Sequence, residues 1–267
     1  MSGTPEPHPL DVVPPARIAA LVEEVGVRKV ALGFIETFTL AVLAGAFIAF
    51  GAMFYTAVVT GSELGFGPTR LLGGMAFSLG LVLVIVGGAE LFTGNSLIVL
   101  ARASGKITTA ALLRNWAIVW FGNLVGAVGT ALLVHLSGVL DMGDGAVAAT
   151  ALSIADAKLA LDPVEAFARG ILCNVLVCLA VWMCLAAHNV SGKVLVILFP
   201  ITAFVVLGFE HSVANMYLIP VAMLHSGLFD MAGLAANLAL VTAGNIVGGG
   251  VLVALVYWLI YRRPHSA

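Results

Sequence analysis

Six long apolar runs dominate this sequence and restrict it to a membrane fold. They lie near residues 30–59, 70–102, 110–139, 163–187, 194–224 and 232–261. Each run is close to the length that a helix needs to cross a bilayer. The chain is 61% hydrophobic and only 10% charged, whereas a soluble domain is about 25% charged. Barrel strands would alternate apolar and polar residues, and these runs do not. The sequence therefore predicts an all-α integral membrane protein with six transmembrane helices.

The basic residues predict how these helices are oriented. With the N-terminus in the cytoplasm, nine of the 12 Lys and Arg residues fall inside, as the positive-inside rule requires. Only Arg70, Lys158 and Arg169 fall outside or in the outer ends of spans. Both termini are therefore expected in the cytoplasm. Residues 1–29 are then a cytoplasmic N-terminal segment with an amphipathic helix. Residues 140–162 form an extracytoplasmic connector, and residues 262–267 form a cytoplasmic tail.

Three motifs recur in the same order in the two halves, 30–139 and 163–261. The pattern G-x-E-x-x-x-[GA]-N covers residues 88–95 and again 208–215, and G-N-x-V-G covers 122–126 and 244–248. A shorter match joins Glu36 and Phe38 to Glu165 and Phe167. Such a series indicates a duplication. Because each half has three spans, the copies are expected to run in opposite directions, as in the inverted 3+3 repeat of many transporters.

The repeated G-x-E-x-x-x-[GA]-N segments are the best candidates for a site. Gly and Asn tolerate the dihedral angles of a helix break, and Asn is a preferred N-cap. We therefore expect helices two and five to be broken, with Asn95 and Asn215 capping new half-helices. Half-helix N-termini suit an anion. The alternative is a continuous helix that packs Glu90 and Glu210 inside the bundle.

Ionisable residues within a membrane span are costly and mark function by default. The deep ones here are Glu90, Glu210 and His211. His211 is either a satisfied core histidine or a hydrogen-bond donor to a passing anion. Lys158 is either a solvated surface lysine or an electrostatic lure for anions. No metal site, cofactor or catalytic set is expected, because His211 lacks a second ligand at metal spacing.

Several strings resemble the formate/nitrite transporter family. They are Leu91-Phe92-Thr93, the segment from Gly208 to Met216, the segment from Gly244 to Gly250, Asn115-Trp116 followed by Gly122-Asn123, and the segment from Cys173 to Met183. The resemblance covers about residues 12–264 and is greatest to bacterial formate channels. It implies an aquaporin-like protomer with broken helices two and five, assembled as a homopentamer in the bacterial inner membrane, with one pore per protomer.

The resemblance also implies roles for individual residues. His211 would be the central pore histidine, with Thr93 and Asn174 as its polar companions. Lys158 would be the vestibule lysine, with Glu210 as its partner. Two apolar constrictions would be formed by Phe77, Leu81, Leu91, Phe92 and Phe204.

The implied activity is a channel or transporter for small monovalent weak-acid anions, with formate the first candidate. The anion would take up a proton and cross the apolar constrictions as a neutral acid; His211 would either supply this proton or only stabilise the anion. Nitrite, hydrosulfide, acetate and lactate remain alternatives, since Thr93 is followed by Gly94, as in nitrite members of the family. Protons and membrane lipid are the other expected partners, and nucleic acid is not one.

Three other classes of protein stay open at this point. A neutral-solute channel of the aquaporin type would share paired half-helices, but the Asn-Pro-Ala motifs are missing: Ser96 follows Asn95, and Met216 follows Asn215. An enzyme would need a nucleophile with its base, and the adjacency of Ser212 and His211 in sequence does not establish one. A structural assembly protein would not need buried Glu and His in matched breaks.

Overall fold

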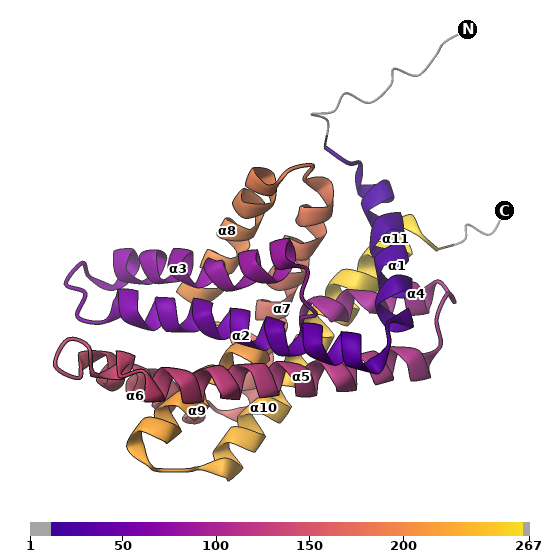
Figure 1. The fold of residues 1–267 in the computed structure, drawn as a ribbon. Coiled ribbons are helices and arrows are strands. Elements are labelled where there is room, and N and C mark those ends of the chain that lie inside the picture. The colour runs from indigo at the N-terminus through magenta and orange to yellow at the C-terminus, as the bar shows by residue number, and fades with distance from the viewer. Residues whose placement is uncertain (1–11, 264–267) are drawn as a thin grey trace, which may run out of the picture.

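The computed structural model describes residues 12–263, and within this range the chain is all-α, without strands. Residues 1–11 of the expected N-terminal segment and 264–267 of the expected tail lie outside the described residues. The longer helices are α1 (Pro15–Ala31), α2 (Phe34–Val59), α3 (Phe66–Gly87), α5 (Thr109–Leu136), α6 (Ala146–Leu159), α7 (Pro163–Ala186), α8 (Val190–Val206), α9 (Ser212–Ser226) and α10 (Met231–Ile246). The short elements are η1 (Gly94–Ile98), α4 (Val99–Ala103), η2 (Val139–Asp141), the π-helical η3 (Val247–Leu255) and α11 (Val256–Tyr261). In Figure 1, α2, α3 and α5 run alongside one another, while α1, α4 and α11 gather at one end of the molecule.

The predicted all-α membrane fold is confirmed, and each predicted run coincides with helical residues. Within the described range, five helical stretches are long and apolar enough to cross a membrane: α2, α3, α5, α7 and the continuous stretch Met231–Tyr261. The remaining predicted run is split into the shorter helices α8 and α9. The orientation of the two halves in the membrane stays a prediction.

Local sequence explains where the helices begin. The side chains of Thr108, Asp162, Asn189 and Asp230 each accept a backbone N–H in the first turn of the helix that follows them. Such caps satisfy donors that a helix N-terminus leaves free. α1 instead begins with Pro15 and ends with Arg28 and Lys29 in its last turn, where positive charge is favourable.

Helices α3 and α8 both end abruptly at a glycine in the left-handed region. Gly88 has φ of 75° and Gly208 has φ of 68°, a conformation that glycine adopts without steric cost. The two predicted helix breaks therefore exist. After the breaks, the chain resumes as η1 and α9.

The predicted capping role of Asn95 and Asn215 is wrong. Asn95 lies within η1, and the residue before that element is Thr93. Asn215 lies within the first turn of α9, and its cap is His211, whose ring accepts the N–H of Ala214. Both asparagine side chains instead hold the glutamate that precedes the break. Each asparagine already lies inside the element that follows the break, so its side-chain oxygen is not at the cap position, and its Nδ2 is free to donate to the carboxylate.

Glycines bring the helices of each half into backbone contact. A Cβ on Gly126 of α5 would collide with the carbonyl of Val42 on α2, and a Cβ on Gly248 would collide with the carbonyl of Ile171 on α7. These two contacts join matching positions of the two halves. Such close approach is typical of helix packing in membranes, and it fixes the frame around both breaks.

Candidate functional site

An asparagine from a neighbouring helix holds each break in place. Asn123 of α5 accepts the N–H of Phe92 at 2.9 Å and donates to the carbonyls of Ala41 and Glu90 at 2.7 and 2.9 Å. Asn245 makes the same three bonds in the second half. It accepts the N–H of Ser212 at 2.9 Å and donates to the carbonyls of Gly170 and Glu210 at 2.8 and 3.0 Å. The backbone groups freed by the breaks are thereby satisfied away from water.

The first break carries a buried ion pair between Lys29 and Glu90. The ammonium of Lys29, in the last turn of α1, donates to Glu90 Oε1 at 2.7 Å and to Asn95 Oδ1 at 2.9 Å. Asn95 Nδ2 donates to Glu90 Oε2 at 2.7 Å and to Asn115 Oδ1 at 3.0 Å. Each oxygen of the buried carboxylate therefore has a donor, which compensates for its desolvation.

The second break carries the same cluster with Lys158 and Glu210. The Lys158 ammonium, in the last turn of α6, donates to Glu210 Oε1 at 2.8 Å. Asn215 Nδ2 donates to Glu210 Oε2 at 2.6 Å and to Asn237 Oδ1 at 2.8 Å. One bond differs: Lys158 does not reach the asparagine, and Asn215 Oδ1 is buried without a partner among the described residues. The Lys158 ammonium therefore makes fewer bonds than that of Lys29.

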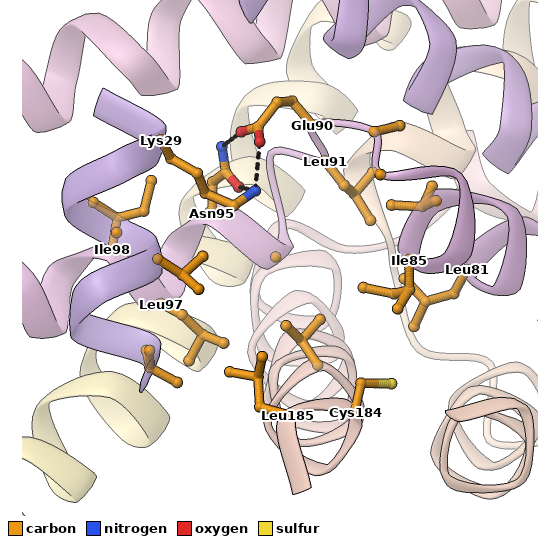
Figure 2. A pocket seen from close by; sticks show the side chains of 18 of the residues that line it. Lys29, Leu81, Ile85, Glu90, Leu91, Asn95, Leu97, Ile98, Cys184 and Leu185 are labelled. Carbon is orange, nitrogen blue, oxygen red and sulfur yellow. Dashed lines mark hydrogen bonds and ion pairs between the residues drawn. The ribbon is translucent and has the colours of Figure 1, made fainter. Parts of the chain in front are cut away.

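Each cluster opens into its own cavity. The Lys29 cavity has a volume of about 270 Å³, and its walls are mostly aliphatic side chains from α1, α3, η1 and α7, with Lys29, Glu90 and Asn95 as polar groups (Figure 2). Lys193 of α8 also lines it. The Lys158 cavity has a volume of about 310 Å³ and is more polar, because Arg70, Lys158, Arg169, Glu210 and His211 all line it. Both cavities could hold a small ion with part of its hydration shell.

The partition between the cavities is thin. Leu81 lines the Lys29 cavity, and Phe77, four residues earlier on α3, lines the Lys158 cavity. Four residues of a helix span about 6 Å. Leu91 lines the first cavity and His211, at the matching position after the second break, lines the other. The two cavities thus approach each other at the breaks.

His211 is the polar group at this partition, and its hydrogen bonds define its tautomer. Nδ1 accepts the N–H of Ala214 at 3.1 Å and must therefore be unprotonated. In the neutral ring, the proton then lies on Nε2, which is 3.0 Å from Thr93 Oγ1. Phe204 stacks on the ring, with centroids 5.9 Å apart. The site therefore presents one N–H donor between an aromatic face and a hydroxyl.

Thr93 and Asn174, the expected polar companions of His211, make different contacts. The Thr93 side chain contacts His211 directly. The Asn174 amide donates to the carbonyl of Thr93 at 3.2 Å, to Ser96 Oγ at 3.1 Å and to the carbonyl of Asn245 at 2.6 Å. Asn174 is fully buried and lines neither cavity. In this structure it joins the two halves behind the site.

The five expected constriction residues divide into three groups. Leu81 and Leu91 line the Lys29 cavity, and Phe77 and Phe204 line the Lys158 cavity, where their rings meet edge to face at 5.4 Å. Phe92 lines neither cavity and packs against Trp116, with centroids 6.1 Å apart.

A third ionic cluster, around Glu23, fixes the helix that carries Lys29. Glu23 of α1 is fully buried and contacts Lys106, Arg262 Nε at 3.0 Å and Ser104 Oγ at 2.7 Å. Burial alone would raise the pKa of Glu23. The hydrogen bonds from Arg262, Lys106 and Ser104 outweigh burial and lower the pKa from 4.5 to about 2. The carboxylate therefore stays charged and ties α1 to the segment after α4 and to the end of α11.

Sequence reasoning missed several residues of this site. Lys29, Asn115 and Asn237 complete the two clusters. Of these three, only Lys29 could have been found from the sequence, because the number of residues between Lys29 and Lys158 matches the offset between the two repeats. Arg70 and Arg169 were noted only for their outer position, which gives no indication that they share a cavity. Among the described residues, no group of three or more His, Cys, Asp or Glu side chains could hold a metal ion.

Comparisons with known proteins find relatives along nearly the whole chain. The sequence profile of the formate/nitrite transporter family matches residues 16–259. The formate channel FocA of Escherichia coli K12 is 42% identical, over 97% of this chain and 98% of its own length. A probable formate transporter of Methanothermobacter thermautotrophicus is 41% identical, over 88% of this chain and 92% of its own length.

Two solved structures have the same fold. A pentameric formate channel with formate bound superposes with a TM-score of 0.79 at 41% identity, over 86% of this chain and 98% of that one. An ion channel described as a member of the FNT family gives a TM-score of 0.82 at 32% identity, over 91% of this chain and 98% of that one. These matches are to channels and transporters, not to enzymes, and they show that the chain belongs to the formate/nitrite transporter family.

Proposed function

We propose that the protein conducts small weak-acid anions, formate first, through a path that joins the Lys29 and Lys158 cavities. The observation that carries this proposal is the placement of a lysine on either side of a thin apolar partition whose polar group is His211. Formate is the first candidate because several relatives are named as formate channels.

The lysines collect the anion and the apolar walls then remove its water. An ammonium in a low-dielectric cavity attracts an anion more strongly than one in bulk water. As the anion leaves water, its charged form becomes less favourable, so the pKa of the weak acid rises. A proton taken up at this point lets the acid pass Leu81, Leu91, Phe77 and Phe204 as a neutral molecule.

His211 serves this path as a hydrogen-bond donor. Its Nδ1 is occupied by the N–H of Ala214, so only the Nε2–H can turn from Thr93 to a passing anion. Protonation of Nδ1 would break the cap of α9. This arrangement favours the role of stabilising the anion over the transfer of a proton through the ring.

We further propose that the protomer assembles as a pentamer in the bacterial inner membrane, with both termini in the cytoplasm. A pentameric relative supports the assembly. The excess of basic residues on the Lys29 side supports the orientation. The Lys158 cavity then faces outward.

Uptake into liposomes tests the proposed function. Purified protein is compared with empty liposomes for formate, nitrite, hydrosulfide and chloride at a neutral and a mildly acidic pH. We expect formate uptake to rise at acidic pH because the anion crosses together with a proton, and chloride uptake to be minor because chloride is hard to protonate. Brisk nitrite or hydrosulfide flux without formate flux would change the substrate. Absence of all anion flux from folded protein would overturn the proposal.

A further inference from the structure

The three basic residues on the Lys158 side converge on one cavity. The chain has 12 Lys and Arg residues, and only Arg70, Lys158 and Arg169 are predicted on that side. All three line the Lys158 cavity, although they come from α3, α6 and α7. The positive-inside rule disfavours basic residues on this side of the membrane. The three that do occur there lie together, where an anion would enter the cavity.

Lys158 alone does not give this cavity its positive charge. Its ammonium is paired with the buried carboxylate of Glu210 at 2.8 Å. The remaining charge comes from the two guanidinium groups. Arg169 lies 3.7 Å from Glu165, an exposed residue outside the cavity lining, and this is too long for a hydrogen bond. No acidic partner of Arg70 is found among the described residues.

The two arginines approach the same backbone position. A Cβ on Gly208 would lie 3.2 Å from Nη2 of Arg70 and 3.9 Å from Nη1 of Arg169. Arg70 uses Nε and Nη2 to donate to the carbonyls of Val206 and Val205, at the end of α8. Within residues 12–263, the Nη1 hydrogens of Arg70 and the guanidinium donors of Arg169 make no hydrogen bond; their other neighbours are the Phe66 ring, 5.2 Å from Arg70 Cζ, and the Glu165 carboxylate. Two guanidinium groups with free N–H donors suit the planar, bidentate geometry of a carboxylate.

The repeated frame does not require an arginine at position 169. The Arg169 carbonyl accepts the N–H of Glu210, and the matching contact in the first half is made by Leu40, whose carbonyl accepts the N–H of Glu90. The backbone contact is therefore the same with leucine. The Arg169 guanidinium has no counterpart in the first half, so its presence in the Lys158 cavity is not explained by the fold.

We propose that Arg70 and Arg169 form a binding site for a small carboxylate at the Gly208 edge of the Lys158 cavity, which receives the anion before Lys158 does. The inference rests on the proposed function, since it names a step of the same path. The site raises the local concentration of the anion and makes loading from this side more efficient than loading from the Lys29 side.

Binding of formate to the detergent-solubilised protein tests the site independently of transport. Saturation-transfer NMR of the formate proton is measured for the wild type, Arg169→Leu, Arg169→Lys and, as a matched control, Arg114→Leu, which changes an exposed arginine outside both cavities. We expect Arg169→Leu to raise the half-saturating concentration about five- to tenfold, the effect of losing a solvent-accessible charge-assisted bond. Arg169→Lys keeps part of the binding and Arg114→Leu keeps all of it. Unchanged binding in Arg169→Leu, or an equal loss in Arg114→Leu, overturns the proposal.

A second experiment restores the charge at position 169 chemically, so that formate binding with and without this charge is compared in the same folded protein. The three native cysteines are buried, so Arg169→Cys offers one accessible thiol. An aminoethyl methanethiosulfonate reagent adds a positive charge there, and a sulfonatoethyl reagent adds a negative one. We expect formate binding to recover with the first and to fall further with the second; equal effects overturn the site.

Flux measurements separate the site from the proposed function. If the wild type carries no formate but Arg169→Leu loses formate binding, the site stands and the function fails. If the wild type carries formate and Arg169→Leu binds and carries it as before, the function stands and the site fails.

Discussion

The Lys29 and Lys158 cavities share one frame but differ in what lines them. Both have a lysine, a glutamate and two asparagines in the same arrangement, and both are held by a buried asparagine that makes three matched bonds. At the partition, the first has Leu91 where the second has His211. The frame is thus duplicated, whereas the groups that face the path are not. This difference suggests that the frame keeps the breaks stable and that the unmatched residues decide what passes and from which side.

The largest expected effects follow from the matched residues. Asn123→Ala and Asn245→Ala each remove three buried hydrogen bonds, and at roughly 1 kcal/mol each we expect a loss of about 3 kcal/mol of stability. The measurement is thermal unfolding in detergent. Asn189→Ala, which removes only an exposed cap, is the control and should cost about 1 kcal/mol. A clearly unequal loss between the two halves would contradict the view that the frame is equivalent.

The next effect concerns the partition, where the halves differ. His211→Leu copies the residue of the first break, so we expect the fold to be retained apart from the lost cap of α9. Formate flux should fall roughly tenfold to a hundredfold, because a hydrogen bond to an anion is worth about 1.5–3 kcal/mol. His135→Leu, at the end of α5, is the control. If the His211→Leu protein carried formate at the wild-type rate, His211 would have no role in conducting the anion.

A smaller effect should distinguish the two lysines. Removing a lysine alone would strand a buried carboxylate, so the double variants Lys29→Met/Glu90→Gln and Lys158→Met/Glu210→Gln are compared. We expect the Lys158 pair to raise the half-saturating formate concentration more, about fivefold against about twofold, because Lys29 is also held by Asn95. The measurement is uptake as a function of formate concentration. An equal rise for both would indicate that the extra bond of Lys29 has no consequence.

Much of this comparison could be predicted from sequence because it depends on the local backbone. Gly88 and Gly208 end their helices through a conformation that glycine favours, and the repeated Glu and Asn mark the same places. The partners from other helices could not be predicted in this way. Lys29 ends a helix with an ordinary basic last turn, and Asn115 belongs to a string that gives no indication of its neighbour. The expected caps failed because each element begins before its asparagine, at Gly94 and at Ser212, which leaves Asn95 and Asn215 inside the helix, where they bond to the glutamate of the same motif.

The helices that carry the two lysines differ in how they are held. α1 is fixed by the buried Glu23 with Lys106 and Arg262, whereas α6 buries only apolar residues: Val147, Ala148, Ala151 and Ala155. The position of α6 that matches Glu23 is Leu152. Each helix makes one buried lysine–glutamate pair, and α1 has in addition a buried carboxylate of its own, Glu23, which α6 lacks.

The pH dependence of α1 gives the smallest expected effect. The pKa of Glu23 is about 2 when α1 is docked and 4.5 ordinarily, so the undocked form binds the proton more readily. The contribution of Glu23 to docking is complete above about pH 4.5 and is lost as the pH falls toward about 2. Hydrogen exchange of α1, referred to α6 at each pH, should show stable docking at mildly acidic pH. Glu23→Gln should raise α1 exchange at neutral pH by an amount equivalent to about 1 kcal/mol. If α1 of the wild type already loosened at mildly acidic pH, acid-stimulated formate uptake would have to be ascribed to release of this helix instead of to a proton carried with the anion.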